Sequence, residues 1–287
     1  MCNEQNAHEK LRILAIVAHP HDFTHCSGTC GVHVRLGDEV TVVTLMNGRK
    51  MHNEKYYDEL KKPVCEQNPD IVNMSLEEYG KQKEQEFIKG VELFGITDIR
   101  ILHAPEPFRF FKSPEYAEEV AKIILDVRPD IVITQSPYID ENDFQRNHMA
   151  NLVLDDHSQV AIAVHEGLYI ASVPNHETKV VPHRVAMVIY MGVYFNRDRV
   201  DFYVDISDFV EQRIMAEAMF DSQGHTYEYA KKSIERTVGG QGSMSRMAYS
   251  EGFVRSTFEV CEKIPISPLS LRRAKESALA ALKRIEG

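Results

Sequence analysis

Side chains of metal-binding type stand at two points of this sequence where an apolar run gives way to a loop. His19 and Asp22 come directly after the apolar run at 12–18, and His148 follows the run at 131–135. Two imidazoles and one carboxylate form a donor set that suits zinc. Three protein ligands would leave a fourth position open for water, as a hydrolytic site requires. The pattern indicates a metal site to which both loops contribute.

Apolar runs alternate with stretches of helical spacing, and this alternation would bring the two loops together. Strand–helix–strand units build parallel sheets, and in such sheets the loops after the strands meet at one edge. We therefore predict an α/β fold, a Rossmann-like three-layer sandwich with a mostly parallel sheet. The predicted strands are 12–18, 39–46, 99–103, 131–135, 186–190 and 202–206, and the predicted helices are 24–36, 78–94, 114–127, 147–165, 207–219 and 268–285.

No linker-like stretch or internal repeat divides the chain, so we expect residues 1–287 to form one domain. Residues 1–10 are expected to be disordered. Residues 266–287 are expected to form a helical extension, whose charged face is either solvated or a contact between copies in a homo-oligomer. The polar stretch 47–77 is expected to cross over the active face, and the glycine-rich part of 224–250 to be irregular.

Composition narrows the classes of partner and compartment. The formal net charge is -10 and no block of lysine and arginine appears, which argues against a general affinity for nucleic acid or anionic membranes and favours a small-molecule substrate. The five cysteines form no CxxC pair, and no hydrophobic leader precedes them. No apolar run approaches the roughly 20 residues that a membrane span needs. We expect a soluble cytoplasmic protein.

Several short motifs occur together in a recognisable order. The first strand is followed by Ala18-His-Pro-His-Asp22 and then by Ser27-Gly-Thr29 and Gly37-Asp-Glu-Val40. Val204-Asp-Ile-Ser207, Asp221-Ser-Gln223 and Ser250-Glu-Gly-Phe253 follow later in the chain. In these motifs, over nearly its whole length, the chain resembles the LmbE-like or PIG-L family of metal-dependent N-deacetylases.

The resemblance implies a zinc-dependent hydrolase of a carbon–nitrogen bond that removes the acyl group from an amino sugar or a conjugate of one. Carried over by position, it implies that His19, Asp22 and His148 are the metal ligands. The chain departs from the family at the residues that handle protons. His21 stands where the family has the carboxylate of its general base, and Gln145 stands where it has the first histidine of its second motif.

These departures lead to a hypothesis about the chemistry. His21 can accept a proton, since imidazole titrates near neutral pH, and must then return it to the leaving amine itself. Gln145 can donate a hydrogen bond to a developing oxyanion but cannot deliver a proton. Arg49, Asp143 and Arg146 either contact the substrate or are solvated loop charges.

The sequence is also compatible with other functions and with a second metal site. The altered proton-handling residues are also compatible with another sugar-processing reaction on the same metal, such as elimination or glycosidic cleavage, and with a silent sugar-binding protein. A second metal on His25, Cys26, Cys30 and His33 competes with simple packing of small cysteines in a helix, which we favour. The remaining histidines have no partner at motif spacing and are interpreted as surface or core residues: His52, His103, His157, His165, His176, His183 and His225.

Overall fold

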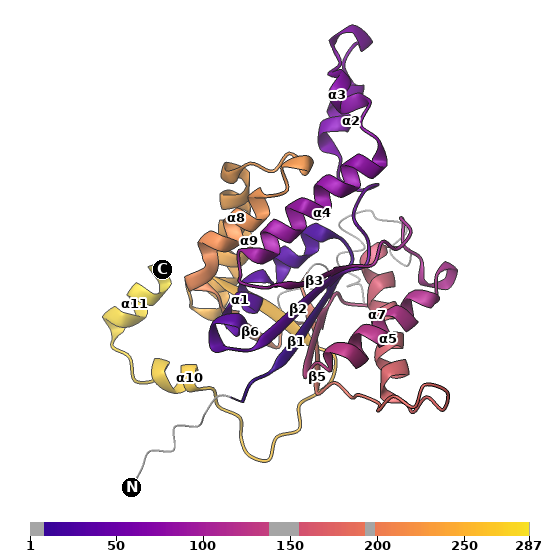
Figure 1. The fold of residues 1–287 in the computed structure, drawn as a ribbon. Coiled ribbons are helices and arrows are strands. Elements are labelled where there is room, and N and C mark those ends of the chain that lie inside the picture. The colour runs from indigo at the N-terminus through magenta and orange to yellow at the C-terminus, as the bar shows by residue number, and fades with distance from the viewer. Residues whose placement is uncertain (1–8, 138–154, 193–198, 287) are drawn as a thin grey trace.

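One mixed sheet of seven strands forms the centre of the protein in the computed structural model, which describes residues 9–137, 155–192 and 199–286 (Figure 1). The strand order is β3-β2-β1-β4-β5-β7-β6. β7 runs antiparallel to the other six strands, which are parallel to one another, so the predicted mostly parallel sheet is confirmed. The strands are β1 Arg12–Val17, β2 Glu39–Thr44, β3 Asp98–Ile101, β4 Ile131–Thr134, β5 Met187–Met191, β6 Phe202–Asp205 and β7 Ser250–Arg255.

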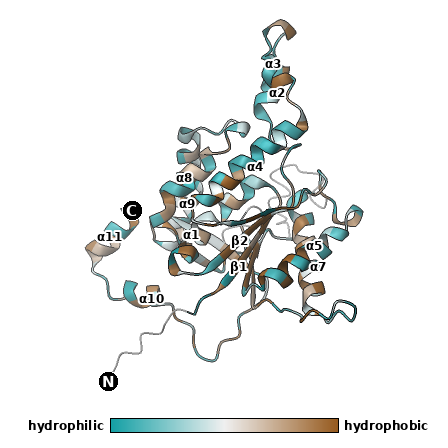
Figure 2. Ribbon diagram, in the orientation of Figure 1, coloured by the Kyte–Doolittle hydropathy of each residue, from teal (hydrophilic) through white to brown (hydrophobic). Residues whose placement is uncertain are grey.

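Helices cover both faces of this sheet, as Figure 1 shows, because its central strands are apolar on both faces. In β1, alternate residues belong to different cores: Ile13 and Ala15 pack on one side, Leu14 and Ile16 on the other. Figure 2 shows the central strands as hydrophobic and the outer helix faces as mixed or hydrophilic. One face carries α1 Ser27–Leu36, α4 Leu76–Glu92, α8 Val210–Ala218 and α9 Tyr227–Ser245, and the other α5 Glu115–Val127 and α7 Asp156–Ser172.

The remaining helices lie outside these layers. The stretch 47–77 contains α2 Glu54–Leu60, η2 Val64–Glu66 and α3 Pro69–Val72 and projects from the body at the top of Figure 1. The C-terminal extension forms two short helices, α10 Pro268–Arg273 and α11 Ala278–Glu286, instead of the single predicted one. Within the described ranges, no helix combines the length and the apolarity needed to cross a bilayer.

Strand order reverses beside β1, which fixes where a site can form. The chain moves outward from β1 to β2 and β3, and later returns to place β4 against the free side of β1. Ligand sites of open α/β sheets lie beyond the carboxyl ends of the strands at such a reversal. The turn η1 Pro20–His25 and the segment after β4 both leave the sheet at this point.

The glycine-rich segment after residue 224 was predicted to be irregular, and this was wrong: it forms α9. Thr226 caps its first turn by accepting a hydrogen bond from the amide of Tyr229. Ala230, Ile234 and Val238 recur every four residues and are buried together with Ile214 and Ile206. Tertiary packing of this stripe outweighs the poor helix propensity of the glycines. The next strand, β7, was also absent from the prediction.

Two glycines of α9 give a matched test of this packing. A Cβ at Gly239 would be in ordinary contact with the Tyr249 ring, 3.5 Å away, whereas one at Gly242 would overlap the backbone carbonyl of Ala248. We expect Gly239→Ala to raise the free energy of unfolding by about 0.5–1 kcal/mol, because alanine favours helix. We expect Gly242→Ala to lower it by about 1–3 kcal/mol through overpacking. Urea denaturation of both variants checks this; equal effects would contradict it.

Candidate metal centre

The turn after β1 is ordered by its own side chains. His19 is the N-cap residue of η1, and Pro20 takes the first helical position, where a missing amide hydrogen is tolerated. The Asp22 carboxylate accepts a hydrogen bond from the backbone amide of His19, with Oδ2 2.8 Å from the nitrogen. The Nδ1 atom of His19 lies 3.4 Å from the same oxygen. The motif therefore holds its imidazole and carboxylate on one side of the turn.

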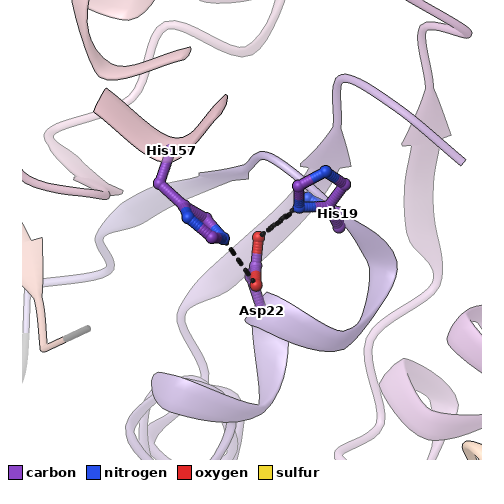
Figure 3. A group of neighbouring side chains, drawn as sticks. All are labelled: His19, Asp22 and His157. Atoms are coloured by element: carbon purple, nitrogen blue, oxygen red, sulfur yellow. Dashed lines mark hydrogen bonds and ion pairs between the residues drawn. The ribbon is translucent and has the colours of Figure 1, made fainter. Parts of the chain in front are cut away.

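The third member of the group is His157, in the first turn of α7. Its Nε2 lies 3.3 Å from Oδ1 of Asp22, and its ring stands edge-on to that of His19 with the centroids 5.3 Å apart. Figure 3 shows both imidazoles directed at the carboxylate between them. One ligand atom from each of His19, Asp22 and His157 lies within 4.8 Å of the others. This donor set is two imidazoles and one carboxylate.

Further polar groups hold these three side chains in place. Gln135, just after β4, donates a hydrogen bond from Nε2 to Oδ2 of Asp22 over 3.0 Å. Asp155 is the N-cap of α7 and lies 3.2 Å from Nδ1 of His157. Asp156 is paired with Arg109 and places its other oxygen 3.3 Å from Nε2 of His19. Carboxylates and amides in such positions orient metal ligands and strengthen them as donors.

The charges of the group favour a cation at its centre. Burial by itself lowers the pKa of His157, but the carboxylates of Asp22 and Asp155 outweigh it and raise this pKa to about 11. Burial likewise opposes the charge of Asp22, yet the two histidines hold its pKa well below the ordinary range. Nε2 of His19 and Oδ2 of Asp156 are buried 3.3 Å from one another and have no other hydrogen-bond partner within the described part of the chain. A divalent ion fits this donor set.

The pH dependence of metal affinity tests this electrostatic account. The metal-free protein carries a proton on His157 at neutral pH, since the pKa is about 11, and a cation must displace that proton. The pKa of His19 is raised as well, despite its burial, by Asp156 and Asp22. We therefore expect the apparent Kd for zinc to fall at least about tenfold per pH unit between about pH 6 and pH 8. Titration against a competing chelator measures this slope. A flat profile would show that the site binds zinc without losing a proton.

The same shift predicts how stability depends on pH. The pKa of His157 in the folded, metal-free protein lies above its ordinary value of 6.5, so folding favours the protonated form. That stabilisation is fully present below about pH 6.5 and is lost as the pH rises toward 11. We expect the Tm of the metal-free protein to fall over this pH interval. The Tm of His157→Ala should not show this fall. Thermal melts of both proteins in the presence of a chelator check the sign.

His21 lies apart from the three converging residues. Its Nε2 is 2.8 Å from Oε1 of Glu217 on α8, and its ring stands edge-on to those of Phe220 and His225. The hypothesis that His21 accepts a proton therefore applies to Nδ1 as long as Nε2 is held by Glu217. This role stays a prediction.

The other predicted site residues are placed only in part. Asp143, Gln145, Arg146 and His148 lie outside the described residues, so their roles as ligand, donor or substrate contact stay predictions. Arg49 follows β2, where its backbone amide donates to Oε1 of Glu106 over 3.2 Å.

His157 was interpreted as a surface or core histidine, and the structure places it between Asp22 and Asp155. Its signal is the run Asp155-Asp156-His157 directly before an apolar helix, where the first aspartate is the N-cap and accepts from the amide of Ser158. A capping aspartate fixes the start of a helix, and the histidine two residues later then faces the carboxyl edge of the sheet. A predicted helix start at 147 hid this signal, because α7 begins at Asp156.

The cysteine-containing alternative is resolved in favour of packing. Cys26 and Cys30 are buried in the core beneath α1. Burial lowers the pKa of His25 to about 4, and His33 is paired with Asp38 at 2.7 Å. Among the described residues, the groups of three or more ligand-type side chains close enough to share an ion are the one around Asp22 and another around Glu217, and neither includes a cysteine.

Comparison with known proteins gives a family and a fold. The family model described as PIG-L, GlcNAc-PI de-N-acetylase, matches residues 14–164. The 4-carboxy-2-hydroxymuconate hydratase GalB of Pseudomonas putida KT2440 shares the fold with a TM-score of 0.69 and 18% identity, over 89% of this chain and 100% of that one. N,N'-diacetylchitobiose deacetylase of Pyrococcus horikoshii shares the fold with a TM-score of 0.67 and 19% identity, over 88% of this chain and 86% of that one. The zinc-inhibited form of a teicoplanin deacetylase shares the fold with a TM-score of 0.52 and 14% identity, over 86% of this chain and 100% of that one.

Proposed function

We propose that this chain, which belongs to the PIG-L family of de-N-acetylases, is a metal-dependent hydrolase that cleaves an amide bond with a cation held on His19, Asp22 and His157. The family match confirms the resemblance inferred from the sequence motifs. The observation that carries the proposal is the convergence of these three side chains, from two separate parts of the chain, within 4.8 Å at the carboxyl edge of the sheet. Zinc is the ion that this donor set suits best.

The substrate that we propose is an N-acylated amino sugar or a conjugate that contains one. The family description and the fold shared with a diacetylchitobiose deacetylase support this class. The negative net charge of -10 agrees with a small-molecule substrate better than with a polyanion. Arg49, Asp143 and Arg146 remain the predicted contacts for its hydroxyl or anionic groups.

The residues of the site suit hydrolysis for physical reasons. A cation bound here would polarise the carbonyl and make water more acidic. Gln135 donates a hydrogen bond to Asp22, and Asp155 is hydrogen-bonded to His157. Both side chains are therefore oriented before substrate binds, and little reorganisation is needed. The roles predicted for His21 as proton acceptor and Gln145 as hydrogen-bond donor complete the proposal.

Acetate release from a panel of N-acetylated amino sugars tests this function. The purified chain is stripped with a chelator, reloaded with zinc, and assayed for acetate and free amine. We expect activity only after reloading, with one amine formed for each acetate. An active metal-free protein would contradict the metal role. A zinc-loaded protein that releases no acetate from any member of the panel would contradict the amidase proposal.

A second candidate is a lyase that adds or removes water on the same metal. It is favoured by His21, which replaces the family's base carboxylate with a group of higher ordinary pKa. The fold shared with a hydratase supports it. The same assay separates the candidates, because a lyase would form or consume an absorbing double bond and release neither acetate nor amine.

A further inference from the structure

A second cluster of ligand-type side chains lies beside the first and consists of His21, Glu217 and His225. We propose that this cluster is a second site for a divalent cation, zinc or ferrous iron, which goes beyond the hydrolase function proposed above. One ligand atom from each residue lies within 4.8 Å of the others. Two histidines and one carboxylate with open positions are a donor set that suits these two metals.

The distances within this cluster are close to those that a metal requires. Nε2 of His21 and Nδ1 of His225 lie 2.8 Å and 3.2 Å from the same oxygen, Oε1 of Glu217. Two ligands that each lie about 2.1 Å from a tetrahedral zinc are about 3.4 Å apart. An ion would therefore have to spread the Glu217–His225 pair by about 0.2 Å and the Glu217–His21 pair by about 0.6 Å, a change that side-chain rotation can supply.

Two of the three side chains stand on helical elements, and His225 lies in the short connection between η7 and α9. Glu217 is in α8. The chain then passes through η7 Asp221–Gln223 and turns back at Gly224, whose φ of 79° is in the left-handed region that glycine adopts readily. This turn returns the ring of His225 to Glu217. His21 is in η1, where the hydroxyl of Thr24 donates to its carbonyl oxygen over 2.8 Å.

The surroundings leave one side of the cluster open and one side fixed. Arg213 donates from Nη1 to Oε2 of Glu217 over 3.0 Å, which orients the carboxylate and leaves Oε1 toward the histidines. The side chains of His21 and His225 are 22% and 14% exposed, against 6% for Glu217. An ion can therefore enter from the imidazole side, and three protein ligands leave it a position for a substrate oxygen or water.

The two proposed sites cannot be independent. His21 and Asp22 are adjacent in sequence, so two dications would repel one another, and we expect the second site to bind more weakly than the first. A cation on His21 would also prevent this imidazole from serving as the predicted proton acceptor. The proton shuttle on His21 therefore operates in the protein that carries one ion on the first site, and an ion on the weaker second site replaces it.

Metal stoichiometry tests the second site in the full chain. The protein is stripped with a chelator and titrated with zinc by calorimetry, and then with cobalt, whose absorption reports tetrahedral nitrogen and oxygen ligands. We expect two ions per chain for the unmodified protein, one for His225→Ala and one for His157→Ala. His103→Ala removes a histidine that is 60% exposed and outside both clusters, and should still bind two.

The outcomes separate this proposal from the function proposed above. One ion per chain, lost in His157→Ala and bound with unchanged affinity in His225→Ala, would overturn the second site and leave the first intact. Two ions in His225→Ala would overturn it as well. Glu217→Gln, which keeps the size of the side chain and weakens it as a ligand, repeats the test should the histidine variant fold poorly, as judged by circular dichroism. It should also bind one ion.

Discussion

Replacing His157 by alanine should remove the catalytic metal and lower kcat/KM by about a thousand-fold, equal to about 4 kcal/mol of transition-state stabilisation. The side chain provides one of three converging ligand atoms, and the two that remain, on His19 and Asp22, are too few for a stable zinc site. The measurement pairs metal analysis of the purified protein with the acetate assay. A variant that retains its zinc and its activity would refute the assignment.

Two other histidines sharpen this experiment. His165 lies two turns along the same helix, where its Nε2 is 2.8 Å from the hydroxyl of Tyr190, so His165→Ala should keep the metal. His148 is the ligand that the sequence predicted, and it lies outside the described residues. Zinc lost in His148→Ala would support that prediction as a further ligand. Zinc retained there and lost in His157→Ala would leave His157 as the third protein ligand.

Replacing Arg213 by methionine should produce the largest loss of stability, about 3–5 kcal/mol in the free energy of unfolding. The arginine is 3% exposed and lies between two buried carboxylates, 3.0 Å from Glu217 and 3.8 Å from Glu251. Its removal leaves both negative charges without their shared cation. Methionine has a similar volume, so the effect reports charge and hydrogen bonding more than a cavity.

The pH dependence of this variant provides a check on the cause. Burial already raises the pKa of Glu251, and loss of Arg213 removes a group that opposes this rise. Protonation of Glu251, which keeps only its hydrogen bonds from Gly28 and Thr29, then removes the buried charge, so the difference between Arg213→Met and the unmodified protein should shrink as the pH is lowered from about 8 to about 5. Lys81→Met breaks an exposed pair with Glu77 and should leave the unfolding midpoint unchanged. A loss independent of pH would indicate a packing effect instead.

The parts of the fold that sequence could predict are those with strong local patterns. The apolar runs of β1, β2 and β4 are buried on both faces, and the His19-Pro20-His21-Asp22 string takes its shape from contacts within four residues. The expectation that His19 and Asp22 converge depends on these local contacts alone. It requires no contact with residues that are distant in sequence.

The parts that could not be predicted depend on contacts between distant residues. Helix α9 forms because Ile234 and Val238 pack against Ile214, which outweighs its glycines. Glu217 has no motif of its own, and its place beside His21, 196 residues away in sequence, follows only from the packing of α8 against η1. His157 was missed for a different reason, since the predicted helix began at 147, whereas α7 begins at Asp156 and its first turn carries His157.

The loop after β2 is held by a single buried carboxylate. Glu106 accepts hydrogen bonds from the backbone amides of Gly48, Arg49 and Lys50, and Lys83 donates to the carbonyls of Gly48 and Met51. The Nζ atom of Lys50 also donates to the carbonyl oxygen of Glu106 over 3.0 Å, so the side chain at position 50 helps to hold the loop. At position 49 the contact with Glu106 comes from the backbone amide. Position 49 can therefore be randomised in a library that searches for altered substrate preference, with Lys50 kept unchanged.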